Sequence, residues 1–230
     1  RHRYQQGDQE LKESITNISH DLRTPLTAIC GYLDLLEREE KNESVRRYLS
    51  QIENRTGALK NLTEELLRYS VITSSPKLNP QRMDLVRALE ESLLSFYGVM
   101  QEKEIQPQIV LPEEPVWCTL DTEAVNRIFS NIICNALKYS DGDFYVSMKK
   151  DGSITFSNTA QNLDAVTTGR LFDRFYTVET SHNSTGLGLS IAKLLTERMG
   201  GTITADYSHG RLHIRTRFMT CTVPVIDSCS

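Results

Sequence analysis

The feature that most constrains the fold is a helical period of apolar residues over the first third of the chain. Apolar side chains recur three or four positions apart, which is the spacing of one buried stripe on an α-helix. The first stripe comprises Leu11, Ile15, Ile18, Leu22, Leu26, Ile29, Leu33 and Leu36, and the second comprises Val45, Leu49, Ile52, Leu59, Leu62, Leu66 and Tyr69. We expect a helix from about Asp8 to Arg38, a polar turn from Glu39 to Ser44, and a second long helix antiparallel to the first.

A hairpin of two helices over residues 1–73 can cover only part of its own apolar surface. Two such hairpins related by a two-fold axis would close a four-helix bundle, in which both stripes are buried. We therefore expect a homodimer through the helical hairpin. The alternative is that both stripes pack against the C-terminal part of the same chain.

Short strands and helices alternate over residues 77–219, beyond a linker of small polar residues and proline at Thr73-Ser74-Ser75-Pro76. Asp151-Gly152 and His209-Gly210 indicate two hairpin turns. Strands are expected at Gln81–Leu85, Pro107–Leu111, Val116–Leu120, Phe144–Lys149, Ser153–Ser157, Thr202–Tyr207 and Arg211–Phe218. We expect one helix that is capped by Asp84 and reaches about Lys103, and a second that is capped by Asp121 or Thr122. A third helix is expected from Ile191 to Met199. We expect an α/β sandwich with helices on one face of a mixed, largely antiparallel sheet. The tail, residues 220–230, has no clear pattern.

Composition and charge narrow the classes of function. With 230 residues, of which 39% are hydrophobic, the chain can form two cores, and we favour two domains. A net charge of -4 leaves no overall basic surface, which argues against direct binding of nucleic acid. The five cysteines form no CxxC pair and no metal-ligand spacing, so they fit buried thiols in a reducing cytoplasm. No apolar run has the length of a membrane span, and we expect no membrane segment in this chain.

His20 is the candidate reactive residue of the first helix. It lies between two residues of the apolar stripe and about 200° around the helix from each, so we expect it to face solvent. Asp21 is an adjacent carboxylate that can orient or deprotonate an imidazole, and Thr24 lies one turn on along the same face. Pro25 removes a backbone donor and should bend the helix there. By itself, an exposed histidine is usually an ordinary surface residue.

Two further segments are candidates for binding a nucleotide. Asn131, Asn135 and Lys138 share one helix face, and two amide oxygens with an ammonium group suit a hydrated Mg²⁺ and a polyphosphate. The alternative is a solvated polar face. Gly186-Leu187-Gly188-Leu189-Ser190 leads into a helix that ends at Gly200-Gly201, and glycines before a helix let backbone amides approach phosphates.

The segment Ser19-His20-Asp21-Leu22-Arg23-Thr24-Pro25-Leu26-Thr27 closely resembles the phosphoacceptor box of two-component sensor histidine kinases. The resemblance implies that His20 is phosphorylated. It also implies that Thr24 holds a water molecule in line with the phospho-aspartate of a response regulator.

Three other segments resemble boxes of the ATP-binding domain of the same kinases, the GHKL or Bergerat fold. Asn131 to Ser140 resembles the N box, which implies that Asn135 ligates Mg²⁺, that Lys138 contacts the phosphates and that Tyr139 contacts the adenine. Ser184 to Lys193 resembles the G2 box and Leu171 to Tyr176 the F box, with a mobile lid from Val178 to Asn183. The implied ATP contacts in these two boxes are Arg174, Phe175, Thr185, Gly186, Leu187, Gly188 and Leu189. Phe172 and Phe175 could equally be core aromatics.

One box departs from the family. Aligning Ile154 to Leu163 on the usual DxGxG segment places Asn158 where the adenine-reading aspartate belongs, and Ala160 and Asn162 where the two glycines belong. A neutral amide makes a weaker hydrogen bond than a carboxylate, so we expect roughly tenfold weaker ATP binding. The amide can also rotate to offer its NH₂ group to guanine, which predicts poorer discrimination between ATP and GTP.

The resemblance covers about Leu11 to Phe218 and implies the cytoplasmic kinase core of a membrane-anchored sensor. The basic start Arg1-His2-Arg3-Tyr4 is consistent with the flank of an anchor. Such a core uses Mg-ATP to phosphorylate His20 and passes the phosphoryl group to an aspartate on the receiver domain of a response regulator. One alternative is a catalytically weak scaffold, which only the altered loop favours. Another is a GHKL ATPase that drives conformational change, against which the His20 segment argues.

Overall fold

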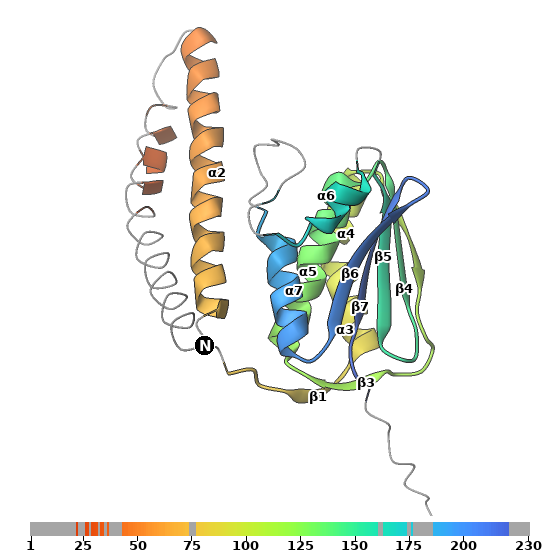
Figure 1. Ribbon diagram of the computed structural model, residues 1–230. Helices are drawn as coiled ribbons and strands as arrows, with labels where there is room; N and C mark the ends of the chain where they lie inside the picture. The colour runs from red at the N-terminus through yellow and green to blue at the C-terminus, as the bar shows by residue number, and fades with distance from the viewer. Residues whose placement is uncertain are drawn as a thin grey trace, which may run out of the picture. The chain divides into compact units, whose positions relative to one another are not determined.

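The computed structural model describes residues 43–73, 77–160, 163–173, 176 and 186–220, together with residues 22, 26–27, 29–31, 33–34 and 36. The chain divides into two compact units. The helical unit comprises residues 1–77 and 179–187, and its secondary structure is α2, Glu43–Thr73, with the described helical residues before it. The α/β unit contains the remaining helices and strands (Figure 1).

The helical unit has the period that the sequence predicts. All described residues between Leu22 and Leu36 are helical, and the predicted second helix corresponds to α2. Along both helices, buried and exposed positions of the stripe alternate, and the positions of each kind recur seven residues apart. Leu26 and Leu33 are only 4% and 6% exposed, and Thr56 and Thr63 are buried, with both hydroxyl groups donating to carbonyls of their own helix. The intervening apolar positions Leu22, Ile29, Leu36, Val45, Ile52 and Leu59 are between 38% and 47% exposed.

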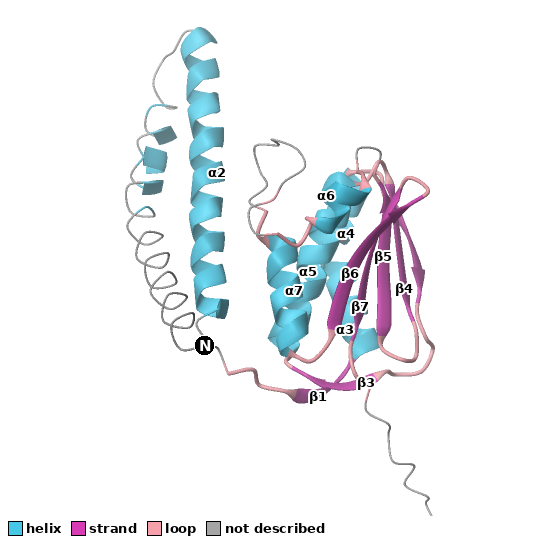
Figure 2. Ribbon diagram, viewed as in Figure 1, coloured by secondary structure: helices cyan, strands magenta, loops and turns pink. Residues whose placement is uncertain are grey.

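The α/β unit is built on a five-stranded sheet in the order β2-β4-β5-β7-β6 (Figure 2). The strands are β2 Gln106–Val110, β4 Asp143–Met148, β5 Ser153–Thr159, β6 Thr202–Ser208 and β7 Arg211–Arg217. β2 runs parallel to β4, and the other neighbours are antiparallel, so the prediction of a mixed, largely antiparallel sheet is confirmed. A separate antiparallel pair joins β1, Gln81–Asp84, to β3, Trp117–Leu120.

The helices of this unit cover one face of the sheet (Figures 1 and 2). They are α3 Leu85–Ser95, α4 Tyr97–Glu102, α5 Thr122–Tyr139, α6 Ala165–Gly169 and α7 Gly188–Arg198. The central helix α5 buries its apolar stripe, including Ile128, Phe129 and Ile132, and Phe129 meets Phe156 of β5 with ring centroids 6.1 Å apart. Burying this face fixes the direction of the opposite, polar face of α5.

Local signals predict most boundaries of the α/β unit. Asp84 and Asp121 cap α3 and α5, because their carboxylates accept hydrogen bonds from the amides of Val86 and Ala124. The turn between β4 and β5 needs Gly152, whose φ is +78° and whose added Cβ would meet the Phe218 carbonyl at 2.5 Å.

The predicted helix from Leu85 to Lys103 is wrong in one respect, because it breaks at Phe96 into α3 and α4. The hydroxyl of Ser95 donates to the carbonyl of Ser92, and the Phe96 amide turns to the carbonyl of Leu93 instead. The short helix α6, capped by Asp164, was not predicted, and α7 begins at Gly188 rather than at Ile191.

Candidate active site

Asn131, Asn135 and Lys138 lie together on the half-buried polar face of α5, as the sequence predicts. This face is set by the neighbouring buried positions Ile132 and Ile133, which pack into the core. The result is a row of two amides and one ammonium group that is held by a rigid helix.

Gly188 at the start of α7 lies against Asn131. A Cβ added to Gly188 would lie 3.4 Å from Oδ1 of Asn131, so glycine allows this end of α7 to approach the amide closely. Nδ2 of Asn131 is buried and has no hydrogen-bond partner in the part of the chain that the structure describes. A buried donor without a partner is costly, and an oxygen of a bound phosphate would satisfy it. The space beside Gly188 and the buried Nδ2 donor of Asn131 together fit a phosphate group.

The next residues along the glycine segment agree with that interpretation. Gly186 has a φ of +69°, and Leu187 follows it directly before the N-terminus of α7. Leu189 is buried in the first turn of α7. The helix dipole places partial positive charge at the N-terminus of this eleven-residue helix, which favours an anion.

Lys138 and Tyr139 occupy the C-terminal turn of α5. The ammonium group of Lys138 lies 5.6 Å from the centre of the Tyr139 ring, which is a cation–π distance. Both side chains are half-buried. A phosphate that recruits the Lys138 ammonium group would therefore compete with the Tyr139 ring for it.

Asn158 is 2% exposed near the end of β5. Its amide nitrogen donates to the carbonyl of Thr159 at 3.1 Å. Ala160, two residues further along the segment that departs from the family pattern, is also buried, and its amide donates to the Gly210 carbonyl. The alanine that the alignment places at a family glycine therefore lies in a paired segment of backbone.

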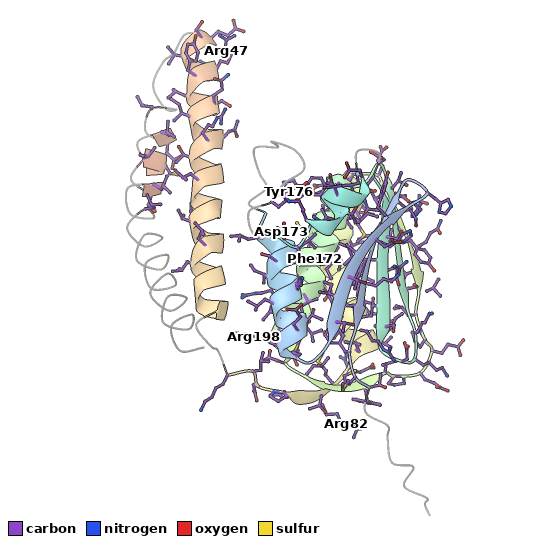
Figure 3. The ribbon with its side chains drawn as sticks, in the orientation of Figure 1. Arg47, Arg82, Phe172, Asp173, Tyr176 and Arg198 are labelled. Carbon is purple, nitrogen blue, oxygen red and sulfur yellow. The ribbon has the colours of Figure 1, made fainter. Side chains whose placement is uncertain are left out.

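The F-box segment contributes two cation–π contacts that the sequence analysis did not predict. Lys193 of α7 lies 5.5 Å from the ring centre of Phe172, and Arg170 lies 4.3 Å from that of Tyr176. Figure 3 labels Phe172, Asp173 and Tyr176 on this segment, between α6 and α7. Phe172 is half-buried and not part of the core. No sequence signal pairs Lys193 with Phe172, because the two lie on separate elements.

Several predicted site residues and segments lie outside the described residues. They are His20, Asp21, Thr24, Arg174, Phe175, Thr185, Asn162, the predicted lid from Val178 to Asn183 and the tail beyond Thr220. Among the described residues, no cluster of three or more His, Cys, Asp or Glu side chains could hold a metal ion. In the same residues, no helix combines the length and the apolar character that crossing a membrane requires.

Comparisons with known proteins agree with this geometry. Residues 10–75 match the family model of the His Kinase A (phospho-acceptor) domain, and residues 120–226 match that of the Histidine kinase-, DNA gyrase B-, and HSP90-like ATPase.

The Sensor histidine kinase YcbM of Bacillus subtilis is 30% identical over 86% of this chain, which spans 68% of that relative. The Sensor protein VanSC of Enterococcus gallinarum is 33% identical over 87% of this chain, which spans 58% of it. Among solved structures, full-length ShkA in complex with AMPPNP has a TM-score of 0.68 at 23% identity. That alignment covers 93% of this chain and 47% of ShkA, and at this identity the likeness concerns the fold.

Proposed function

This chain belongs to the sensor histidine kinase family, and from that premise we propose that its α/β unit binds Mg-ATP and transfers the γ-phosphoryl group to His20. The fold of that unit is of the GHKL type. In the proposed division, residues 1–73 form the phosphoacceptor hairpin and residues 77–219 form the ATP-binding domain. No role is assigned to residues 220–230.

The observation that carries this proposal is the approach of Gly188 to Asn131, whose buried Nδ2 has no hydrogen-bond partner among the described residues. Asn135 and Lys138 follow on the same face of α5 and add an oxygen ligand and a positive charge. Asn135 would hold Mg²⁺ through its amide oxygen, and Lys138 would bind a phosphate oxygen. The bound ion would supply neutralisation of the phosphate charge.

The remaining roles follow the family pattern. Asn158 and Tyr139 would contact the base, and Gly186 to Leu189 would present backbone amides to the phosphates. Arg174, Phe175 and Thr185 are proposed as further ATP contacts.

At the phosphoacceptor, one neutral nitrogen of the His20 imidazole would attack the γ-phosphorus atom while the other keeps its proton. Asp21 would accept a hydrogen bond from that second nitrogen and so fix the tautomer. The phosphoryl group would next pass to an aspartate on the receiver domain of a response regulator. Thr24 would position a water molecule for the later hydrolysis of that phospho-aspartate.

We further propose that two chains form a homodimer through the helical unit. The exposed apolar residues of that unit recur every seven positions, at Leu22, Ile29 and Leu36 and again at Val45, Ile52 and Leu59. A seven-residue repeat is typical of helices that pack side by side in a bundle. The second copy would bury both rows in a four-helix bundle.

The relatives support a larger whole protein, because this chain spans 68% of YcbM and 58% of VanSC. We propose that the chain is the cytoplasmic part of a membrane-anchored sensor. Fractionation of cells that produce the whole protein would test this, since recovery in the soluble fraction would contradict it.

Incubating the purified chain with Mg²⁺ and γ-labelled ATP tests the proposed activity. We expect label on the protein that is lost in acid and kept in alkali, and that moves to an added receiver domain. Release of labelled phosphate without protein label would indicate an ATPase of the wider fold instead. Binding of the receiver domain without any turnover of ATP would indicate a scaffold.

A further inference from the structure

The base-reading end of β5 is held by a carboxylate of the neighbouring strand. Backbone pairing between β4 and β5 ends at Tyr145 opposite Ser157. Two residues further along β5, the Thr159 amide donates to Oδ1 of Asp143 at 2.7 Å. The Asp143 side chain therefore continues the pairing where the backbone ladder stops.

Arg211 of β7 holds that carboxylate from the other side. Its Nη2 lies 2.6 Å from Oδ2 of Asp143, while Nε donates to the Ser157 hydroxyl at 3.3 Å and Nη1 to the Thr159 hydroxyl at 3.4 Å. The side chains of Asp143 and Arg211 are 37% and 36% exposed, so the pair is only partly solvated. One guanidinium group thus joins β7 to both β4 and β5.

The same carboxylate lies next to the end of α5. Ser140 caps α5, and its hydroxyl lies 3.3 Å from Oδ1 of Asp143 and accepts from the Asp143 amide at 2.9 Å. The Asp141 amide also donates to the Thr159 carbonyl, at 3.3 Å. Asp143 therefore links the helix that carries Lys138 to the strand that carries Asn158.

The Thr159 carbonyl held in this way is the group that accepts from Nδ2 of Asn158 at 3.1 Å. That bond engages one of the two N–H groups of the Asn158 amide and fixes which side of the amide carries the oxygen, which is then the acceptor offered to a base. An acceptor pairs with the amino group at position 6 of adenine and is repelled by the carbonyl at that position in guanine. The rotation that would favour guanine breaks the bond to Thr159.

We propose that Asp143, supported by Arg211, is a positioning residue that holds the Thr159 backbone and through it fixes the Asn158 amide as an acceptor, which selects adenine over guanine. The inference rests on the proposed nucleotide site and gives it a base specificity. It opposes the poorer discrimination that the sequence alone predicts for an asparagine at this position.

The electrostatics of the site agree with this role. Partial burial of Asp143 opposes its ionisation, but the hydrogen bonds from Thr159 and the charge of Arg211 outweigh it, and the pKa of Asp143 lies below its usual range. The carboxylate is therefore ionised at neutral pH and accepts from Thr159 and Arg211 together.

Asp151 offers a matched control at the other end of β5. Its Oδ1 accepts from the Ser153 amide at 3.0 Å, and its Oδ2 lies 3.9 Å from Nη2 of Arg217, so the chemistry is the same. It lies in the turn before β5, whereas Asn158 lies near the end of that strand. Loss of Asp151 should therefore leave base selection unchanged.

Calorimetric titration of ADP and of GDP into the whole chain tests the proposal. We expect wild type to prefer ADP, and Asp143→Ala to reduce that preference roughly tenfold, as expected for loss of one oriented hydrogen bond. Asp143→Asn, which keeps an oxygen acceptor, should recover part of the preference. Asp151→Ala should keep all of it.

An ADP preference that stays within twofold of wild type in folded Asp143→Ala overturns the inference while the proposed function stands. If Asp143→Ala does not fold, the decision moves to Asp143→Asn, in which an unchanged preference likewise overturns it. Failure of wild type to bind ADP at all contradicts the proposed function and the inference with it.

Discussion

The two units of this chain complete their cores in different ways. In the α/β unit, the helices bury their apolar stripes on a sheet of the same chain, and Phe129, Ile132 and Phe156 are at most 1% exposed. In the helical unit, apolar side chains at every second position of each stripe are exposed, as at Ile29 and Ile52. The comparison predicts that the α/β unit is stable by itself, whereas the helical unit would gain stability from a second copy in the proposed homodimer.

The largest effect is expected in the core of the α/β unit. Phe156→Ala removes a buried ring that meets Phe129 and leaves a cavity, which should lower the free energy of unfolding by about 3–5 kcal/mol. Thermal unfolding followed by circular dichroism at several protein concentrations would measure this. The loss should be the same at each concentration, and a loss that depends on concentration would break the comparison.

A smaller effect, which should depend on protein concentration, is expected in the helical unit. Ile52→Lys places a charge at an apolar position of α2 and should weaken the dimer by about 1.5–3 kcal/mol per chain. Sedimentation equilibrium would report the shift toward monomer. Glu53→Lys, at the neighbouring exposed position of the same helix, is the control and should leave the dimer intact. Equal behaviour of both variants would mean that Ile52 is not in the interface.

Removing the proposed metal ligand should weaken nucleotide binding without lowering the stability of the fold. Asn135→Ala offers no oxygen to Mg²⁺, so we expect about 10- to 100-fold weaker Mg-dependent binding of ADP and a matching loss of protein label. The half-buried position predicts little change in unfolding temperature. Labelling of Asn135→Ala at the wild-type rate would show that this face of α5 is only solvated.

The smallest effect concerns His213 on β7. Partial burial, followed by the charge of Arg215, lowers the pKa of His213, although Asp206 acts in the opposite direction. The folded state therefore binds a proton less readily than the unfolded chain. The stability that this provides is complete above the usual histidine pKa of about 6.5 and is lost as pH falls below it.

His213→Gln should flatten the dependence of unfolding temperature on pH below about 6.5. The comparison variant is His209→Asn in the exposed turn, where asparagine tolerates the φ of +52°. The charge of His209 is the smallest of the causes that lower the pKa of His213, so His209→Asn should keep most of the pH dependence. Equal pH dependence of wild type and His213→Gln would mean that His213 binds protons equally in the folded and unfolded states.

Sequence reasoning succeeds where a feature is local. The caps Asp84 and Asp121, the turn at Gly152 and the polar face of α5 each depend on a few neighbouring residues, and the structure has them where they are predicted. The break of the helix at Phe96 is also local, but it depends on which acceptor the Ser95 hydroxyl selects.

The contacts that join distant segments could not be predicted in the same way. Asp143 meets Arg211 only because the strand order places β4 and β7 on the two sides of β5, and no periodicity in the sequence carries that register. The approach of Gly188 to Asn131 likewise depends on the packing of α7 against α5.

In the proposed reaction, the α/β unit binds the nucleotide and the helical unit carries the acceptor His20. The most direct test compares wild type with His20→Gln, using Mg²⁺ and γ-labelled ATP for transfer and ADP titration for binding. We predict acid-labile label on the peptide that contains His20 in wild type, no label on His20→Gln, and equal ADP affinity for both proteins. Label that persists on His20→Gln would contradict the account.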